Sequence, residues 1–563
     1  MSEEPYARQF VHSCYMRRPQ EDRDAVVIKE YIYPTKETKT PVPNIRIIEN
    51  PKRQFAITKP QFRTHNEKRE WENLDRVDWY TTYNKDMTEN VYRALYGKLP
   101  YGHVRQKKLD NSPYIYGTKI GIETLIHHRY TEDLNKIDYK PVSPTVGMLD
   151  IETSVLSDDN GKIIIITTTH ENKVYTAILR EFLTYKNEDG EVVEGSLQTL
   201  RNMSENVLHD TIQTYGFEFY YHIADTPQEL IFWIMKNIHE NHTDFIGIWN
   251  IDFDIPKILN TLNQENIPLE DVFSHPDVPE AFRYAEYRPD NSTNAQHFTR
   301  KWHWLNTTGT AQFYDAMCLY SILRVHEGLK QSYSLDAILQ AHGIGEKLKF
   351  KGDIPDVAYM SNIDWHRYMQ EKKPYEYIIY NQYDAMSLQI LEWSINDVNA
   401  VYLLVGDTHM RDFNKQSRMA GDVFHFECLK LGKVIGTIGE EMVGKYDHLI
   451  PKDGGAVLRP ERTHELGMKA LADMPHVITM LHPFTGDLDF SQMYPTAIIC
   501  ANLSRETKKS ALIRVESFDQ GHPQEISSKM GSPVENAQSI GSTYLGLPAY
   551  TEMWAMYKNR HGS

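Results

Sequence analysis

The middle of the chain contains several apolar runs, some of them rich in β-branched residues, and these runs predict buried strands. The run 144–153 stays apolar until polar positions appear at its end, which predicts a buried strand with a polar terminus. Two more runs follow, 161–169 and 173–179, and the first of them is strongly β-branched. Three antiparallel strands are therefore expected to open this part of the chain.

A helix is predicted to begin after Thr226. Threonine is a good N-cap, Pro227 suits the first helical position, and Glu229 completes a capping box three residues after the cap. The apolar face of this helix consists of residues at helical spacing, namely Leu230, Trp233, Ile234 and Ile238.

Two later elements carry polar residues at defined places. A strand is predicted from Phe245 that ends in the polar residues Asn250 and Asp254, before an apolar run over 255–259. Residues 375–390 predict a helix. Tyr380 and Asp384 are four apart on it and therefore share a face.

Carboxylates at the ends of these elements predict a metal site. Asp150 and Glu152 are two apart in a strand, so both project to the same side. Adjacent carboxylates repel each other unless a cation lies between them, and carboxylate oxygens are the ligands that hard divalent cations prefer. Asp254 and Asp384 bring the set to four. The alternative for an isolated Asp-x-Glu is an acidic strand end that binds no ion.

The stretches 150–152, 249–254 and 380–384 resemble, in order and spacing, the three exonuclease motifs of family B DNA polymerases of the T-even phage type. The resemblance implies a mixed α/β, multidomain chain with a ribonuclease H-like 3′–5′ exonuclease domain, which uses two Mg²⁺ or Mn²⁺ ions. One departure is that the gap between Asn250 and Asp254 is one residue shorter than in the T-even enzymes.

The resemblance assigns roles within the exonuclease domain. Tyr380 is expected to orient the attacking water, and Asn250 and Phe253 are expected to contact DNA. The expected metal ligands and catalytic carboxylates are Asp150, Glu152, Asp254 and Asp384.

Residues 487–496 resemble the first polymerase motif of the same family. The resemblance makes Asp489 a catalytic metal ligand and places Tyr494 under the sugar of an incoming nucleotide. Arg560 lies in a helix-like run that resembles the start of the fingers, where the family binds the triphosphate. The paired glycines Gly454 and Gly455 match a family step that contacts template DNA.

A hairpin is predicted between the second and third exonuclease motifs. Runs 282–288 and 298–304 alternate aromatic and basic residues around a turn at 289–292. It resembles the hairpin with which such enzymes part a frayed primer end from its template. The side chains expected to contact DNA are Arg288, Arg300, Lys301 and Trp302. The alternative is a hairpin that packs on its own domain.

The resemblance divides the chain into five segments. They are an N-terminal α+β domain (1–140), the exonuclease domain (141–399), a return to the N-terminal domain (400–450), the first part of the palm (451–546) and the start of the fingers (547–563). The second polymerase aspartate motif and the thumb are absent from the sequence. A second chain that carries these parts is therefore expected to complete polymerisation, unless the sequence is a truncated product.

The resulting hypothesis is the N-terminal part of a phage replicative DNA polymerase with a proofreading exonuclease. Its expected partners are primer-template and single-stranded DNA, dNTPs, the complementing chain and a sliding clamp. Two alternatives stay open, a free-standing 3′–5′ exonuclease and a non-catalytic DNA-binding subunit of a replisome. The second is less consistent with a complete carboxylate set.

Composition changes this picture little. The formal charge of −16 argues against a uniformly basic, nucleic-acid-coating surface, although a basic groove can coexist with acidic metal sites. The four cysteines are far apart and form no zinc or disulfide pattern, which suits a reducing, cytoplasmic location. No run is long and apolar enough to predict a signal peptide or a membrane span.

Overall fold

The structure is a computed structural model that describes residues 4–436, except 67, 70, 103, 157–160, 187–191, 291–296, 349 and 351–359. Contacts divide the chain into two units, Met1–Gly439 and Glu440–Ser563. The second unit lies outside the described residues, as do the expected palm and fingers. The expected polymerase residues outside the described part are Gly454, Gly455, Asp489, Tyr494 and Arg560.

The described part is mixed α/β, and its largest sheet has eight strands in the order β13-β10-β9-β8-β14-β17-β16-β15. The strands are β8 (Val146–Thr153), β9 (Ile163–His170), β10 (Lys173–Leu179), β13 (Glu218–Ala224), β14 (Phe245–Ile248), β15 (Ala285–Arg288), β16 (Trp304–Thr307) and β17 (Gln312–Asp315). Strands β8, β9 and β10 are antiparallel neighbours, which confirms the predicted opening of this domain. Strands β14 and β17 run parallel to β8.

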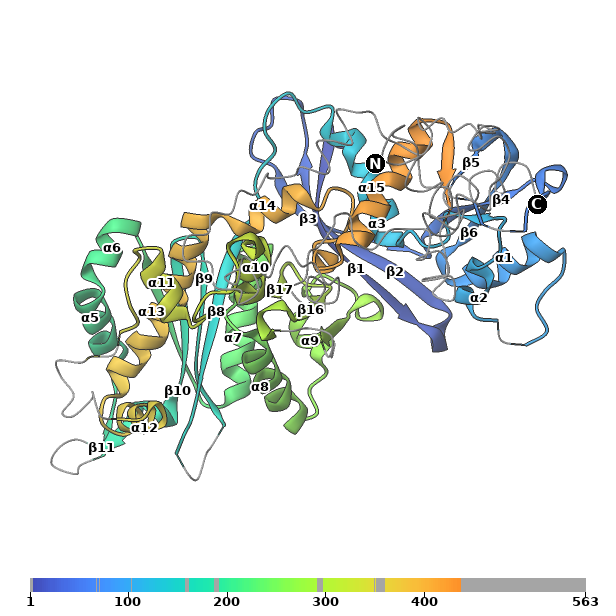
Figure 1. The fold of residues 1–563 in the computed structure, drawn as a ribbon. Coiled ribbons are helices and arrows are strands. Elements are labelled where there is room, and N and C mark those ends of the chain that lie inside the picture. The colour runs from blue at the N-terminus through green and yellow to red at the C-terminus, as the bar shows by residue number, and fades with distance from the viewer. Residues whose placement is uncertain are drawn as a thin grey trace, which may run out of the picture. The chain divides into compact units, whose positions relative to one another are not determined.

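Helices cover this sheet and bury its central strands. In Figure 1 the central strands lie between α13 (Pro374–Ile395) and the pair α7 (Pro227–Glu240) and α8 (Ile251–Gln264). Every residue of β9 except His170 is buried, because both faces of the strand are covered. Coverage on both faces explains why this strand reads as a continuous apolar and threonine run rather than as an alternating one.

Helix α7 begins where the sequence predicts. The Thr226 hydroxyl accepts a hydrogen bond from the Glu229 N–H at 3.3 Å. The Glu229 carboxylate accepts from the Asp225 N–H at 2.7 Å, one residue before the expected capping-box partner. Leu230, Ile234 and Ile238 are buried in the main core.

The element that carries Asp254 differs from the prediction. Strand β14 ends at Ile248, and Asp254 lies in helix α8 rather than at a strand end. Asn250 adopts the left-handed conformation with a φ of +69°, which turns the chain directly from strand to helix. Asparagine tolerates this conformation better than most residues, so a position that the polar pattern predicts as a strand end forms the turn into the helix.

The predicted hairpin exists with a different second strand. β15 pairs antiparallel with β16, and Arg288 lies opposite Trp304. Residues Phe298–Arg300 form a 3₁₀ turn instead of strand. Because β16 also pairs with β17, the hairpin is the edge of the large sheet.

The expected DNA contact by Trp302 is wrong for this structure. Its side chain is only 5 % exposed, and its indole N–H donates to the Arg411 carbonyl at 2.7 Å. A buried indole cannot stack on a base. Arg288 forms an ion pair with Glu286 at 2.6 Å, Arg300 is exposed, and Lys301 is half-buried.

Small sheets build the N-terminal region. Strands β1 (Ala7–Arg18), β2 (Arg23–Tyr33) and β3 (Val42–Glu49) form an antiparallel sheet, and a second sheet has the order β6 (Val77–Tyr83), β4 (Lys52–Thr58), β7 (Ile115–Tyr116). Strand β18 (Lys433–Ile435) pairs antiparallel with β5 (Trp71–Asn73), so residues after 400 return to this region. Strands β11 (Thr184–Lys186) and β12 (Val192–Glu194) pair separately.

The remaining helices pack around these sheets. Those of the N-terminal region and its return are α1 (Met87–Tyr96), α2 (Gln106–Asp110), α3 (Ile122–Leu134), α14 (Asp397–Leu404) and α15 (Gln416–Lys430). Those around the large sheet are α4 (Arg180–Leu183), α5 (Leu197–Val207), α6 (His209–Tyr215), α9 (Leu269–Phe273), α10 (Ala316–Leu323), α11 (Leu335–Ala341) and α12 (Asn362–Lys372).

Candidate metal centre

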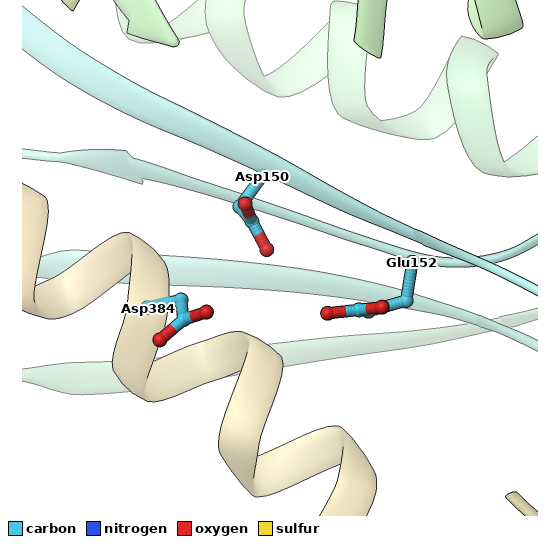
Figure 2. Close-up of side chains that lie close together, drawn as sticks. All are labelled: Asp150, Glu152 and Asp384. Carbon is cyan, nitrogen blue, oxygen red and sulfur yellow. The ribbon is translucent and has the colours of Figure 1, made fainter. Parts of the chain in front are cut away.

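Three carboxylates from two elements converge at one point. Asp150 and Glu152 lie on β8, and Asp384 lies on α13, as Figure 2 shows. One oxygen from each carboxylate lies within 4.8 Å of the other two. The alternation of strand side chains places the first two together, and the long helix brings the third across from them.

One face of α13 supplies most of the surroundings of these carboxylates. The Asn381 amide donates to Asp150 Oδ2 at 2.6 Å, and the Tyr377 hydroxyl donates to Glu152 Oε2 at 2.5 Å. Together with Tyr380 and Asp384, these residues follow the spacing i, i+3, i+4, i+7 of a single helix face. Sequence reasoning found Tyr380 and Asp384 but missed Tyr377 and Asn381, although this periodicity contained the signal.

A lysine that the sequence did not predict lies among the carboxylates. The Lys347 ammonium is 2.5 Å from Asp384 Oδ2 and donates to the Tyr380 hydroxyl at 3.0 Å. Burial lowers the pKa of Lys347, but the carboxylates of Asp384 and Asp150 outweigh burial and raise it. The ammonium therefore stays charged at neutral pH. The lysine is outside any helix or strand, so no periodic pattern marks it.

Asp254 is the fourth expected acidic residue, and it is not one of the three whose carboxylate oxygens lie within 4.8 Å of one another. It is buried in the first turns of α8, and its charge acts on both Asp150 and Glu152. Helix α8 is held in place by Asp315 at the end of β17, because this carboxylate accepts from the Ile251 N–H at 3.1 Å. The same carboxylate caps α10 through the Cys318 N–H at 2.7 Å.

The electrostatics of the site favour a divalent cation. Burial raises the pKa of all four carboxylates, and like-charge neighbours add to the increase at Asp150, Glu152 and Asp254. The pKa of Glu152 rises to about 7. Lys347 can offset only one of these negative charges when they are ionised. Within the described part of the chain, the buried Asp384 Oδ1 has no hydrogen-bond partner. These oxygen donors fit Mg²⁺ or Mn²⁺.

The other two expected exonuclease residues lie at the start of α8. Asn250 is exposed at the N-cap, and Phe253 is 48 % exposed one residue before Asp254. The Lys257 ammonium lies 5.7 Å from the centre of the Phe253 ring. An exposed ring beside a cation offers a surface on which a nucleobase could stack.

The raised pKa values predict how pH and metal act together on stability. Glu152 has a folded-state pKa of about 7, above its ordinary value of 4.5. Between these values the folded state binds more protons than the unfolded state, so the free energy of unfolding falls as pH rises. A divalent cation needs ionised ligands, and its binding strengthens as pH rises. The increase in melting temperature on adding Mn²⁺ should therefore be larger at about pH 8 than at about pH 6.

The matched control removes the titrating carboxylates and keeps their shape. An Asp150→Asn, Glu152→Gln variant should lose both the metal effect on melting temperature and its dependence on pH. Differential scanning calorimetry with Mn²⁺ and with EDTA measures both quantities. An equal metal effect at both pH values in the wild-type protein would contradict the assignment of these carboxylates as ligands.

Comparisons with known proteins give no independent information on the function of this site. Neither a comparison with protein-family models nor one with curated proteins finds a match for this chain. Among the described residues, no helix combines the length and the apolar composition that crossing a membrane requires.

Proposed function

We propose that this chain is a divalent-metal-dependent 3′–5′ exonuclease acting on DNA. The observation that carries the proposal is the convergence of Asp150, Glu152 and Asp384, with Asp254 acting on the same charges. A buried acidic group of this kind is costly without a cation, and phosphodiester hydrolysis is a reaction that bound divalent cations promote.

The strand order supports a ribonuclease H-like domain within this proposal. Three antiparallel strands, β10, β9 and β8, are followed across β8 by the parallel strands β14 and β17. This mixed sheet, with carboxylates on its strand β8, is consistent with the ribonuclease H-like fold that the resemblance to family B polymerases implies. The first carboxylates lie on its central strand β8 and the last on the helix α13 that crosses it.

In the proposed hydrolysis, different residues bind the metal ions, orient the metal ligands and orient the attacking water. When bound, Mg²⁺ or Mn²⁺ supplies an activated water and stabilises the negative charge that develops on the leaving 3′-oxygen. Asp150, Glu152, Asp254 and Asp384 would hold two such ions. Asn381 orients Asp150, and Lys347 both offsets charge and donates to the Tyr380 hydroxyl. That hydroxyl lies beside Asp384, where it could orient an attacking water.

A metal-dependent exonuclease can be distinguished from a non-catalytic DNA-binding subunit by testing whether the degradation of DNA requires a divalent metal. Adding Mg²⁺ to EDTA-treated chain should start the release of nucleotides from single-stranded DNA. DNA affinity should also fall steeply with salt, because phosphate contacts release counterions. Binding of DNA without any nucleotide release at saturating Mg²⁺ would favour a non-catalytic replisome subunit.

The hairpin carries a separate prediction about duplex ends. Arg300 is exposed and Lys301 is half-buried just before β16, so both can reach a DNA strand. Replacing both with alanine should slow degradation of duplex ends and leave single strands unaffected. Lys236→Ala removes a positive charge from the surface of α7, away from the hairpin, and should leave the degradation of both substrates unchanged. Equal slowing on both substrates would leave the hairpin with a structural role only.

Nucleotide polymerisation is the second part of the proposal and rests on the sequence resemblance. Asp489, Tyr494 and Arg560 would bind metal and dNTP on a primer-template, together with a complementing chain. Primer extension by the two chains together, lost in Asp489→Ala while DNA degradation continues, would support it. Extension that survives this substitution would contradict the role of Asp489.

A further inference from the structure

The Glu152 carboxylate is hydrogen-bonded to a network of side chains that takes no direct part in the proposed chemistry. Its Oε2 accepts from the Tyr377 hydroxyl at 2.5 Å. The same hydroxyl oxygen lies 2.8 Å from His366 Nδ1 and 3.2 Å from Gln370 Nε2, both on α12. Tyr377 therefore contacts the carboxylate oxygen directly, and two side chains of α12 contact the Tyr377 hydroxyl.

When Glu152 is ionised, the hydrogen atoms can be assigned in only one consistent way. A phenol has one proton to donate and two lone pairs that accept. An ionised Glu152 can only accept, so the Tyr377 proton goes to it. Gln370 Nε2 carries only donors, and the remaining lone pair accepts from His366, which must carry its proton on Nδ1. Rotation of the Tyr377 hydroxyl away from Glu152 would disturb all three contacts.

Gln370 also holds the backbone that follows Glu152. Its Nε2 donates to the Thr153 carbonyl at 2.9 Å, and its Oε1 accepts from the Val155 N–H at 2.9 Å. The pairing of β8 with β9 is irregular between Glu152 and Thr153. The hydrogen bonds between β8 and β9 are therefore irregular at this end of β8. The side-chain amide of Gln370 adds two hydrogen bonds to the backbone there.

We propose that Tyr377, held by His366 and Gln370, is a positioning residue that fixes the Glu152 carboxylate for a divalent cation. This role rests on the proposed metal-dependent function and adds to it a residue that orients one of the metal ligands. Partners that orient a metal ligand from behind typically change metal affinity by about 10- to 100-fold when they are removed. Glu152 without this contact would sample more orientations, and each bound ion would have to restrict them.

The test is Mn²⁺ binding by Tyr377→Phe, followed by electron paramagnetic resonance and without any substrate. The variant removes one oxygen and keeps the ring, and affinity should fall by about 10- to 100-fold. The Mn²⁺ concentration for half-maximal DNA degradation should rise similarly, while the rate at saturating Mn²⁺ changes much less. Gln370→Ala should shift both quantities in the same direction.

Tyr375→Phe is the matched control on the same helix. The Tyr375 hydroxyl accepts from the Ser196 N–H at 2.7 Å, at the N-cap of α5. It should leave Mn²⁺ affinity unchanged. Wild-type affinity in Tyr377→Phe, or an equal loss in Tyr375→Phe, would overturn the positioning role. Absence of Mn²⁺ binding by the wild-type chain would instead overturn the proposed function itself.

Discussion

Replacing Asp150 and Glu152 together with alanine should lower the rate of DNA degradation by roughly 10³-fold or more. Metal ions stabilise the transition-state charge by several kcal/mol, and about 4 kcal/mol corresponds to this factor. Both carboxylates belong to the group of three oxygens that lie within 4.8 Å of one another. Release of nucleotides from labelled single-stranded DNA at saturating Mg²⁺ measures the effect.

Two controls separate lost chemistry from lost structure in this experiment. Glu205→Ala removes an exposed carboxylate from α5 and should leave the rate unchanged. The double variant should keep a cooperative melting transition in EDTA, because removing like charges from a buried site relieves repulsion. A folded double variant that degrades DNA at the wild-type rate would show that these carboxylates are not the catalytic ligands.

Lys29→Ala should be the most destabilising single substitution predicted here. The Lys29 ammonium on β2 lies 3.3 Å from the Asp244 carboxylate, and both side chains are fully buried. Removing the lysine leaves a buried carboxylate without its cation, a change that typically costs about 3–5 kcal/mol. The Thr145 N–H at 2.8 Å and the Tyr31 hydroxyl also donate to Asp244, and they should limit the loss rather than prevent it.

Urea denaturation measures this free-energy change. Lys36→Ala is the control, because it removes an ion pair with Asp138 at 3.0 Å in which both side chains are largely exposed. Exposed pairs contribute little, so the control should unfold at the wild-type urea concentration. Equal midpoints for the two variants would mean that the Lys29–Asp244 pair does not hold the N-terminal sheet to the start of β14.

Local pattern was sufficient to predict the elements that carry the site. The β-branched run of β9, the Thr226 cap of α7 and the helix over 375–390 all depend on residues close in sequence. The pairing of Asp150 with Glu152 follows from strand alternation alone. Convergence with Asp384 required the family resemblance, because no local rule brings β8 and α13 together.

The features that were missed depend on distant contacts or on single backbone angles. Trp302 reads as a surface aromatic until the Arg411 carbonyl, more than a hundred residues later, covers its indole. Lys347 carries no periodic signal, and only the fold places it beside Asp384. The sequence pattern predicts Asp254 at a strand end, because the pattern does not reveal the left-handed backbone of Asn250 that turns the chain into α8.

The most direct test of the proposed exonuclease is the fate of a 5′-labelled single-stranded oligonucleotide in the presence of Mg²⁺. The wild-type chain should shorten it stepwise from the 3′ end and release mononucleotides, and EDTA should stop the reaction. A strand with a blocked 3′ end should resist. An intact strand after incubation, internal cleavage, or shortening from the 5′ end would contradict a 3′–5′ exonuclease built on Asp150, Glu152 and Asp384.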